Sequence, residues 1–316
     1  MKLIIQIPCL NEAQTLPLVF ADIPKKIKGI DSIEVLIIDD GCTDDTVAVA
    51  RQHGVKHVVH HAKKQGLARA FHDGVLRSLE LGADIVVNTD GDNQYPGKYI
   101  AELVRPIVEG QADIVIADRQ THTIAEFSAG KKLLQRVGTK ILNMAAGTNV
   151  PDAPSGFRAY SRESLLRLNI VTRFSYAMET IVQAGNKGLA IASIPITVNA
   201  KTRESRLFSS NFEHVVKSGS AIFRAFTMYR PYVVFASLGL FLLAVGSIPV
   251  VRYLFFLLAD HTSGARHIQS LIAGSVLLIG SFISFTLGIV GDLIRINRTL
   301  IEDNLEQTKR ARFPKR

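Results

Sequence analysis

The C-terminal third of the chain contains two long stretches that are almost free of charge, and they restrict the possible folds most strongly. Residues 232–257 have Arg252 as their one charged side chain, and residues 268–291 have none. A helix needs about 20 apolar residues to cross a bilayer. Core helices of this length normally have a polar face. We therefore predict two transmembrane helices over 231–294 rather than two buried core helices.

The charges around these stretches predict their orientation in a membrane. The link 260–267 is short, which predicts a helical hairpin, and it contains a single arginine, Arg266. Lysine and arginine gather instead before the first stretch and after the second, at Arg224, Arg230, Arg295, Arg298, Lys309, Arg310, Arg312, Lys315 and Arg316. By the positive-inside rule, both termini face the cytoplasm. We expect a multi-pass protein of the cell (inner) membrane with a basic cytoplasmic tail over 295–316.

The first two thirds of the chain alternate short β-rich runs with helical patterns. Nearly every residue of these runs is apolar, which is typical of strands buried on both faces of a parallel sheet. The predicted strands lie at 3–7, 34–38, 57–59, 84–88 and 113–117, and the predicted helices lie near 15–28, 44–53, 67–81 and 98–109. We expect a Rossmann-like α/β domain over 1–210, with a mostly parallel sheet and helices on both faces. Ligands of such sheets bind at the carboxyl ends of the strands.

Two further segments combine basic residues with a helical pattern. In 211–230, apolar side chains recur at helical spacing and alternate with basic ones. This pattern is typical of an amphipathic helix in the membrane interface, although a helix packed on the domain has the same pattern. A second basic group, Lys131, Lys132 and Arg136, faces either anionic lipid or solvent.

Lysine and arginine outnumber aspartate and glutamate by 37 to 28, which gives a formal charge of +9. This balance suits an anionic partner such as nucleotide phosphates or an acidic membrane surface. The basic residues gather beside the apolar stretches, and no segment combines aromatic and basic side chains in the way that proteins use to recognise nucleic-acid bases. We therefore exclude nucleic acid as a partner. Cys9 and Cys42 are too few for a disulfide framework. The N-terminus lacks the pattern of a signal peptide.

Acidic and polar side chains directly follow four of the predicted strands. Asp39 and Asp40 follow the second strand, and Asp90 and Asp92 follow the fourth. Carboxylates that gather at one edge of a sheet repel one another unless a cation or a donor lies among them. Oxygen ligands alone indicate Mg²⁺ or Mn²⁺. The Asp39 carboxylate could also accept hydrogen bonds from a nucleotide base or ribose.

The sharpest of these motifs is Asp90-x-Asp92-x-Gln94, which directly follows an apolar strand. Asp92 and Gln94 alternate onto one side of an extended loop, so their oxygens can reach one ion. Such an ion would bridge the two phosphates of a nucleoside diphosphate and neutralise the leaving group. A simple turn uses the same residue types, but the position after a buried strand favours a metal site.

Together these motifs resemble family 2 glycosyltransferases with the GT-A fold, over roughly residues 3–210. The matching segments, in the family's order and spacing, are Pro8-x-Leu10-Asn11-Glu12, Ile38-Asp39-Asp40-Gly41-x-Thr43-Asp44-x-Thr46 and Asp90-x-Asp92-x-Gln94-x-Pro96. Two later segments resemble the polyprenyl-phosphate branch of the family, namely Asp152-Ala153-Pro154-Ser155-Gly156-Phe157-Arg158 and Thr202-Arg203-Glu204-Ser205-Arg206-Leu207. That branch includes dolichol-phosphate mannose synthases and bacterial polyprenyl-phosphate glucosyltransferases.

The resemblance implies an inverting enzyme that transfers a sugar from a UDP- or GDP-sugar to a polyprenyl phosphate of the undecaprenyl or dolichyl type. It implies that Arg119 binds the acceptor phosphate and that Asp92 and Gln94 bind the metal ion. Catalytic roles fall to Asp90, close to the donor sugar, and to Asp152, as a base or a charge-orienting carboxylate. The residues implied in nucleotide-sugar binding are Pro8, Leu10, Glu12, Asp39, Asp90, Arg203 and Arg206. Related two-helix enzymes also imply a homo-oligomer.

Three segments depart from the family pattern, the last of them also at Arg203, where a glycine-containing approach is common, and two other functions stay open. Cys42 stands where a serine is usual, Ala117-Asp118 stands where Gly-Ser is usual, and Arg206 replaces a lysine. The alternatives are a membrane-tethered glycosyltransferase with another lipid or glycan acceptor and a non-catalytic nucleotide-binding membrane protein. A processive polysaccharide synthase is excluded, because the chain has no tryptophan for its acceptor motif and two spans are too few for a channel.

Overall fold

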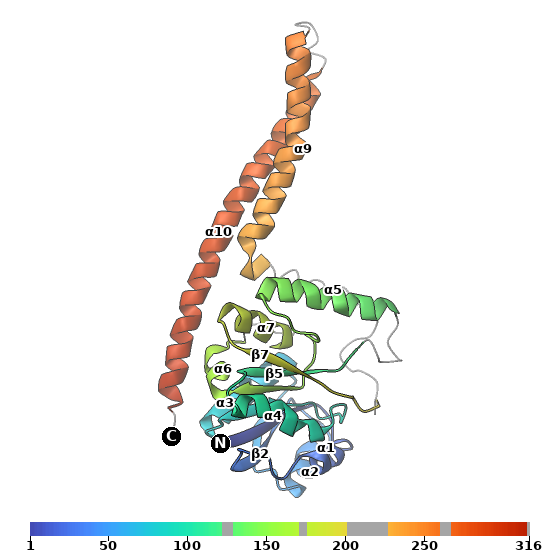
Figure 1. Cartoon of the computed structure of the whole chain (residues 1–316), viewed down its shortest axis with the longest axis vertical. Helices are drawn as coiled ribbons and strands as arrows, with labels where there is room; N and C mark the ends of the chain where they lie inside the picture. Colours follow the sequence, from blue (N-terminus) through green and yellow to red (C-terminus); the bar gives the residue numbers. More distant parts are fainter. Residues whose placement is uncertain (122–128, 171–175, 201–226, 260–266, 315–316) are drawn as a thin grey trace. The chain divides into compact units, whose positions relative to one another are not determined.

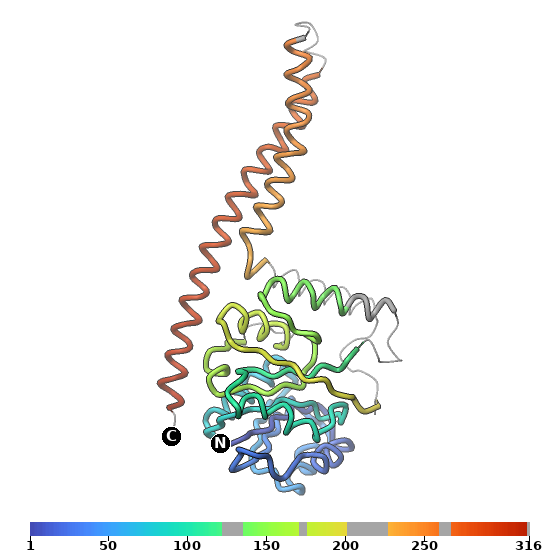
Figure 2. Tube along the Cα trace, in the orientation of Figure 1, coloured from blue at the N-terminus to red at the C-terminus, as the bar shows by residue number. Residues whose placement is uncertain are grey.

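The computed structural model describes residues 1–121, 129–170, 176–200, 227–259 and 267–314. The chain divides into two compact units, Met1–Ala225 with Glu302–Arg316 and Phe226–Ile301. Figure 1 labels most of their helices and some of the strands, and Figure 2 follows the same trace by residue number. Arg203, Arg206 and most of the predicted interfacial helix at 211–230 lie outside the described residues.

The first unit is built on a seven-stranded sheet in the order β3-β2-β1-β4-β6-β5-β7. Its strands are β1 (Lys2–Cys9), β2 (Ser32–Asp39), β3 (His57–His60), β4 (Ile85–Asn88), β5 (Ile114–Asp118), β6 (Arg158–Ser161) and β7 (Ile191–Pro195). All neighbouring strands are parallel except β6, which is antiparallel to β4 and β5. The five predicted strands and the mostly parallel sheet are confirmed, whereas no sequence pattern predicted β6 or β7.

Helices cover both faces of this sheet, as predicted. They are α1 (Leu16–Asp22), α2 (Thr46–Gln52), α3 (Leu67–Glu80), α4 (Ile100–Val108), α5 (Ala129–Ala146), α6 (Arg162–Arg167) and α7 (Tyr176–Asn186), with a 3₁₀ turn at Gly97–Tyr99. Apolar side chains of α1, α2 and α4 form one core cluster with Leu3, Ile5 and Ile7 of β1. On the opposite face, α3 packs so closely that a Cβ at Gly74 would lie 2.7 Å from the Gln6 side-chain oxygen.

Two of these helices differ from the prediction. Helix α1 ends at Asp22 rather than near residue 28, because Ile23 precedes Pro24 and is extended (ψ 125°), as residues before proline usually are. Helix α5 has no counterpart among the predicted helices, although Arg136 of the second basic group belongs to it.

The second unit contains α9 (Pro231–Ala259) and the first part of α10 (Ile268–Arg312), which pack against each other in antiparallel orientation. The Ser281 hydroxyl donates to the Gly239 carbonyl (2.8 Å), and the Ser284 hydroxyl donates to the Phe235 carbonyl (2.8 Å). Small and hydroxyl-bearing residues at such a contact are typical of helices that pack inside a bilayer. The two helices therefore form the predicted hairpin.

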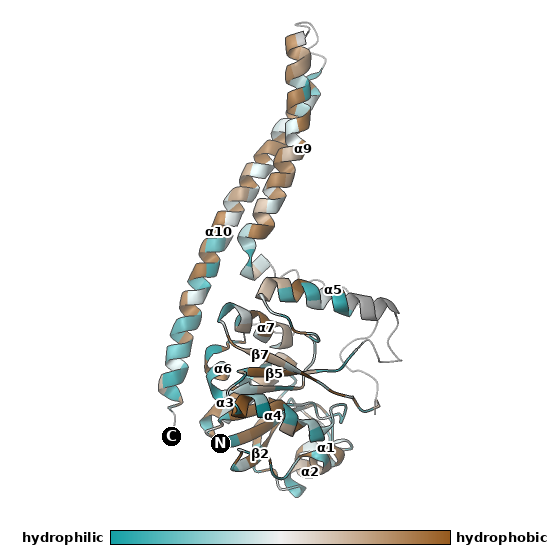
Figure 3. Ribbon diagram, in the orientation of Figure 1, coloured by the Kyte–Doolittle hydropathy of each residue, from teal (hydrophilic) through white to brown (hydrophobic). Residues whose placement is uncertain are grey.

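The outward faces of these two helices are apolar and exposed, as Figure 3 shows for α9 and for the half of α10 beside it. In an apolar stretch of 18 residues from each helix, only 11% is buried in α9 and 22% in α10. Phe241, Ile248 and Leu258 are 63%, 68% and 78% exposed. A soluble core helix does not expose an apolar surface of this extent. Both helices are long and apolar enough to cross a membrane.

Helix α10 runs well past the predicted second span. Its 45 residues correspond to about 68 Å, roughly twice the thickness of the hydrocarbon layer. Its last turns belong to the first unit, where Lys309 donates to the Leu168 carbonyl and Arg310 pairs with Glu163. Part of the predicted basic tail is therefore helical and contacts protein.

Candidate active site

The acidic motifs of the sequence meet at one edge of the sheet. Strands β2, β1 and β4 are parallel neighbours, so residues at or just beyond their carboxyl ends, including Asp39 and Asp90, gather at one edge of the sheet. Strand β6 runs the other way and starts beside the end of β4, with Arg158 opposite Asn88. The loop that precedes β6 therefore reaches the same edge and brings Asp152 to it.

Two hydrogen bonds hold Asp39 at the end of β2. The Cys42 amide donates to its Oδ1 (2.7 Å), and His60 Nδ1 lies 2.6 Å from its Oδ2. Burial alone would raise the pKa of Asp39, but these hydrogen bonds outweigh burial and hold the pKa below its ordinary value. A fixed, ionised carboxylate of this kind can accept hydrogen bonds from a base or a ribose.

Asp40, the next residue, fixes a neighbouring loop instead. Its carboxylate accepts hydrogen bonds from the amides of Gln65 (2.7 Å) and Gly66 (2.9 Å), and His61 Nδ1 lies 2.8 Å from it. Asp40 is 5% exposed. The two adjacent aspartates thus have different roles, because the second one orders the segment between β3 and α3.

The loop after β1 connects to the loop after β4. Pro8 in β1 and Leu10 just beyond it are both half-buried. Glu12 is 5% exposed, and Thr15 Oγ1 lies 3.0 Å from its Oε2 and 2.6 Å from the Gly91 carbonyl oxygen. Glu12 and Thr15 therefore help to hold the acidic loop that follows β4.

The turn after β4 contains the predicted metal ligands, Asp92 and Gln94. Asp92 Oδ1 accepts a hydrogen bond from the Gln94 amide (3.0 Å), and Asn93 adopts a left-handed conformation (φ 59°). Asn199, beyond β7, donates its side chain to the Asn93 carbonyl (2.9 Å) and its amide to the Gln94 carbonyl (3.0 Å). The turn is therefore held both from within and from the segment after β7.

The side chains of Asp92 and Gln94 fit a divalent ion that is shared with a substrate. Both are half-buried and offer oxygen ligands. Within the described parts of the chain, no group of three or more His, Cys, Asp and Glu side chains could hold a metal ion. Mg²⁺ is usually bound by one or two carboxylates, with water and substrate phosphates as its other ligands. The donor set therefore suits an ion that binds together with a diphosphate.

Arg119 directly follows β5, and Asp152 lies in the loop before β6. The two side chains form a buried ion pair. Arg119 Nε donates to Asp152 Oδ2 (2.7 Å) and Nη2 donates to Oδ1 (2.9 Å), and the two side chains are 14% and 3% exposed. Burial alone would lower the pKa of Arg119, but Tyr95, Asp152 and Asp90 outweigh it and raise the pKa above its ordinary value. The structure thus joins two residues to which the sequence resemblance assigns separate roles.

Arg158 is a residue of the site for which no role was predicted. It is fully buried and donates Nε to the Ser155 carbonyl (2.7 Å), Nη2 to the Ala153 carbonyl (2.6 Å) and Nη1 to the Ala177 carbonyl (2.8 Å). These bonds fix the loop that carries Asp152. The segment Asp152–Arg158 contains the only signal, because its resemblance to the polyprenyl-phosphate branch includes the arginine, but only the structure reveals the carbonyl partners.

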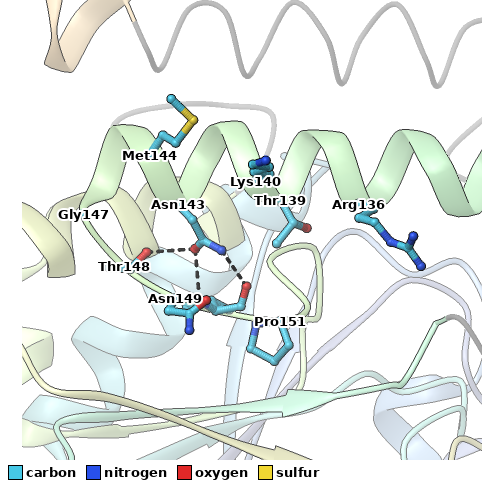
Figure 4. A pocket seen from close by; sticks show the side chains of 10 residues that line it. Arg136, Thr139, Lys140, Asn143, Met144, Gly147, Thr148, Asn149 and Pro151 are labelled. Carbon is cyan, nitrogen blue, oxygen red and sulfur yellow. Dashed lines mark hydrogen bonds between the residues drawn. The ribbon is translucent and has the colours of Figure 1, made fainter.

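A groove of about 410 Å³ lies beside this loop, between α5 and residues 147–151 (Figure 4). Asn143 of α5 fixes residues 148–150, which form one wall of the groove. Its Oδ1 accepts hydrogen bonds from the Thr148 hydroxyl (3.0 Å) and the Val150 amide (3.0 Å). Arg136 and Lys140 line the groove. The acidic residues do not line it, but its last residue, Pro151, directly precedes Asp152.

The predicted site residues in the described part of the chain therefore reach one edge of the sheet. They are Pro8, Leu10, Glu12, Asp39, Asp90, Asp92, Gln94, Arg119 and Asp152. The other two predicted residues, Arg203 and Arg206, are outside the described residues, so their contact with a diphosphate stays a prediction.

Residues 4–168, more than half of the chain, match the family described as Glycosyl transferase family 2. The chain belongs to this family and is a glycosyltransferase. It is 25% identical over 218 residues to the undecaprenyl-phosphate mannosyltransferase of Micrococcus luteus, covering 66% of this chain and 88% of that one. It is 25% identical to the polyprenol monophosphomannose synthase of Mycolicibacterium smegmatis (62% and 77% covered) and 29% identical to the dolichyl-phosphate hexose transferase of Haloferax volcanii (62% and 82% covered). These relatives are named as sugar transferases of polyprenyl phosphates.

Solved structures of glucosyl-3-phosphoglycerate synthase from Mycobacterium tuberculosis share the fold. The complex with Mn²⁺, UDP and glucosyl-3-phosphoglycerate has a TM-score of 0.53 at 24% identity, over 72% of this chain and 78% of that chain. The complex with Mg²⁺ and UDP has a TM-score of 0.53 at 23% identity, with the same coverage. This similarity confirms the predicted GT-A fold.

Proposed function

We propose that this chain transfers a sugar, with inversion, from a UDP- or GDP-sugar to a polyprenyl phosphate at the cytoplasmic face of the membrane. The observation that supports this most directly is the arrangement at the sheet edge. The turn with Asp92 and Gln94 follows β4, whereas Arg119 follows β5 and its buried partner Asp152 precedes β6, so these residues reach the edge from three consecutive strands of the sheet. Asp90 is close enough to Arg119 to contribute to its raised pKa.

The donor side of the proposed site follows from the loops after β1, β2 and β4. Asp39, held ionised by its hydrogen bonds, accepts hydrogen bonds from the nucleoside. Pro8, Leu10 and Glu12 line the same part of the edge. A divalent ion on Asp92 and Gln94 would neutralise the charge that develops on the departing nucleoside diphosphate. Arg203 and Arg206 would close over that diphosphate.

The acceptor side centres on Arg119 and Asp152. A guanidinium has five N–H donors, and Asp152 takes two of those on the Arg119 side chain. The others are available to an acceptor phosphate without breaking the ion pair. An oxygen of that phosphate attacks the anomeric carbon, and the bond from this carbon to the diphosphate oxygen breaks. A phosphate dianion needs little proton removal, so Asp152 acts mainly by holding Arg119, and catalysis is largely positioning and electrostatic stabilisation.

The membrane part of the proposal rests on α9 and α10. Their apolar outer faces suit the acyl region of a bilayer, and a polyprenyl chain is confined to the same region. We place both termini and the first unit on the cytoplasmic side, where the basic residues around the hairpin belong. Self-association through the hairpin is part of the same proposal.

The test is transfer of radiolabelled sugar into an organic-soluble product. Purified full-length protein in detergent receives polyprenyl phosphate, Mg²⁺ or Mn²⁺ and a panel of UDP- and GDP-sugars. The proposal predicts product from one donor, and no product in EDTA. Transfer to a soluble phosphorylated acceptor, with none to the lipid, would contradict the proposed acceptor. Nucleotide binding without transfer from any donor would favour the non-catalytic alternative.

A further inference from the structure

Tyr176, the first residue of α7, buries its hydroxyl between two segments of the proposed site. The residue is 1% exposed, and its ring stacks on Phe71 of α3 with the ring centroids 4.0 Å apart. The hydroxyl accepts a hydrogen bond from Asn88 Nδ2 (2.8 Å) and donates one to the Gly156 carbonyl (3.1 Å). A buried hydroxyl costs stability unless it is bonded, and here both sides of the oxygen are used. The proposed reaction assigns no role to this group.

The two partners of the hydroxyl belong to the two sides of the proposed site. Asn88 is the last residue of β4 and stands two positions before Asp90. Gly156 lies in residues 152–157, which we call the acceptor loop because the loop begins with Asp152. Asn88 Nδ2 also donates directly to the Gly156 carbonyl (3.1 Å). The hydroxyl therefore completes a three-membered junction between the end of β4 and the acceptor loop.

Gly156 depends on two tyrosine hydroxyls for its backbone conformation. Its amide donates to the Tyr95 hydroxyl (3.3 Å), and its carbonyl accepts from the Tyr176 hydroxyl. These bonds hold the planar peptide groups on both sides of Gly156, where the backbone would otherwise be least restricted. A Cβ added at Gly156 would lie 3.2 Å from the Tyr176 oxygen and 3.7 Å from both carboxylate oxygens of Asp90. Gly156 therefore fills a narrow space between that hydroxyl and Asp90.

The hydroxyl of Tyr176 keeps its proton at neutral pH. Burial, together with the neighbouring Tyr160 and Asp90, raises the pKa of Tyr176 well above its ordinary value. The hydrogen bond to the Gly156 carbonyl is therefore maintained over the whole range in which the other site residues titrate. Because Tyr176 neither ionises there nor reaches the surface, it can act on the reaction through position alone.

We propose that the Tyr176 hydroxyl is a positioning group that holds the acceptor loop against Asp90, and so sets the separation between the acceptor phosphate and the donor sugar. The inference rests on the proposed function, which places the acceptor at Arg119 and Asp152 and the donor sugar at Asp90. A displacement of about 1 Å between reacting groups can lower a rate by about a hundredfold. Loss of this one hydroxyl should therefore affect transfer much more than it affects folding.

Tyr176→Phe removes the hydroxyl and keeps the ring that stacks on Phe71. Tyr160→Phe is the matched control. Tyr160 of β6 is 0% exposed and packs against the same Phe71 (centroids 5.5 Å apart), but its hydroxyl has no hydrogen-bond partner among the residues that the structure describes. The control thus takes the same group from the same aromatic cluster without breaking a bond to the acceptor loop. Full-length proteins in detergent are compared by steady-state kinetics in both substrates, by nucleotide binding and by amide hydrogen exchange.

We expect Tyr176→Phe to lower kcat about tenfold and to raise the KM for polyprenyl phosphate several-fold. The KM for the nucleotide-sugar and the affinity for the nucleotide should stay within about twofold of the wild type, because the donor loops keep their bonds. Amide exchange over 152–157 should become faster. Tyr160→Phe should match the wild type in all of these measurements.

A second variant tests the direct contact between the two residues. Gly156→Ala alone adds a methyl group that meets the Tyr176 oxygen. In the Tyr176→Phe background that oxygen is absent, so Gly156→Ala should lower kcat less than it does in the wild type. Losses that simply multiply would show that the two groups act independently, and would overturn the inference.

Equal acceptor kinetics in Tyr176→Phe and Tyr160→Phe would also overturn the inference. So would a fall in kcat with both KM values unchanged, because a smaller folded fraction has that signature. Either result beside intact lipid glycosylation by the wild type leaves the proposed function standing. A wild type that transfers no sugar to the lipid, beside faster exchange over 152–157 in Tyr176→Phe alone, would overturn only the proposed function.

Discussion

Arg119 and Asp152 lie 33 residues apart in the chain and form a two-point ion pair, with Nε–Oδ2 and Nη2–Oδ1 distances of 2.7 and 2.9 Å. Asp152 also accepts a hydrogen bond from the Arg119 amide (3.1 Å). Each charged group is largely buried and has the other as its counter-ion. The pair therefore links the stability of the domain to the chemistry proposed for its acceptor side.

Removing one partner should cost more than removing both. Asp152→Ala leaves the Arg119 guanidinium buried without a counter-ion, and we expect the free energy of unfolding to fall by about 3–5 kcal/mol. The double variant Arg119→Met with Asp152→Leu should recover most of that loss while transfer stays abolished. Chemical denaturation in detergent, followed by circular dichroism, measures the first effect. Arg77, whose side chain is 43% exposed, is the control, because Arg77→Ala should cost under about 1 kcal/mol. Unfolding of Asp152→Ala at the wild-type denaturant concentration would contradict the role of the pair.

Arg158 should order the loop that contains Asp152. Arg158→Met removes the side-chain donors for the carbonyls of Ala153 and Ser155, whereas the Ala177 carbonyl keeps the Thr180 hydroxyl as a donor. Each buried carbonyl left without a partner costs about 1–3 kcal/mol. We expect faster amide hydrogen exchange over 152–157 and lower transfer. The control is Arg51→Met, since Arg51 also donates to two carbonyls, at Val55 and Lys56, but near the surface. Unchanged exchange in the Arg158 variant would show that the loop is ordered without this brace.

The pH dependence of nucleotide binding should report on Asp39. Its pKa is lowered in the folded protein, so its ionised form stabilises the fold above the ordinary value of about 4, and this contribution is lost as the pH falls through the lowered value. His60→Ala removes one of its hydrogen bonds and should move the acid limb of nucleotide binding to higher pH. Isothermal titration at a series of pH values measures the shift. His53→Ala, on the exposed end of α2, should not move it, and equal profiles for all three proteins would argue against Asp39 as a nucleotide ligand.

The end of α10 should be bound to the first unit in solution. Arg162 donates to the carbonyls of Ala83 (3.1 Å) and Phe313 (2.7 Å), and Phe313 is 5% exposed. Arg162→Ala should release this end and make trypsin cleavage after Lys309 several times faster. Limited proteolysis in detergent, read by mass spectrometry, gives the rate. Arg69→Ala, at an exposed residue of α3 that pairs with Asp73, should be cleaved at the wild-type rate, and equal rates for Arg162→Ala would contradict the docking.

Much of the fold could be predicted because the strands of a parallel sheet are apolar along their whole length. Runs such as 35–38 and 85–87 have this property, and the structure confirms the strands that contain them. Strand β6 lacks it, since it begins with the buried Arg158, whose charge is compensated by carbonyls of the preceding loop and of Ala177 in α7. Strand β7 is also difficult, because an edge strand such as Ile191–Pro195 is only half-buried or exposed.

The site was predictable where a residue follows a strand directly. Asp39 directly follows the predicted strand 34–38, and Asp90 and Asp92 come shortly after the predicted strand 84–88, which is enough to place them at the sheet edge. The pairing of Arg119 with Asp152 was not predictable, because it depends on the antiparallel insertion of β6 between β4 and β5. The length of α10 was not predictable from hydropathy either, because charges end an apolar span but do not end a helix.

The most direct test of the central claim compares two acceptors that differ in one group. Full-length protein in vesicles receives its radiolabelled nucleotide-sugar with either polyprenyl phosphate or the corresponding polyprenol, and the initial rates of the wild type and Asp92→Ala are measured with Mg²⁺ and with EDTA. We predict glycolipid from polyprenyl phosphate alone, at a rate that falls at least a hundredfold in Asp92→Ala and in EDTA. Equal transfer to the alcohol, or a rate that neither change lowers, would contradict a metal-assisted transfer to a lipid phosphate.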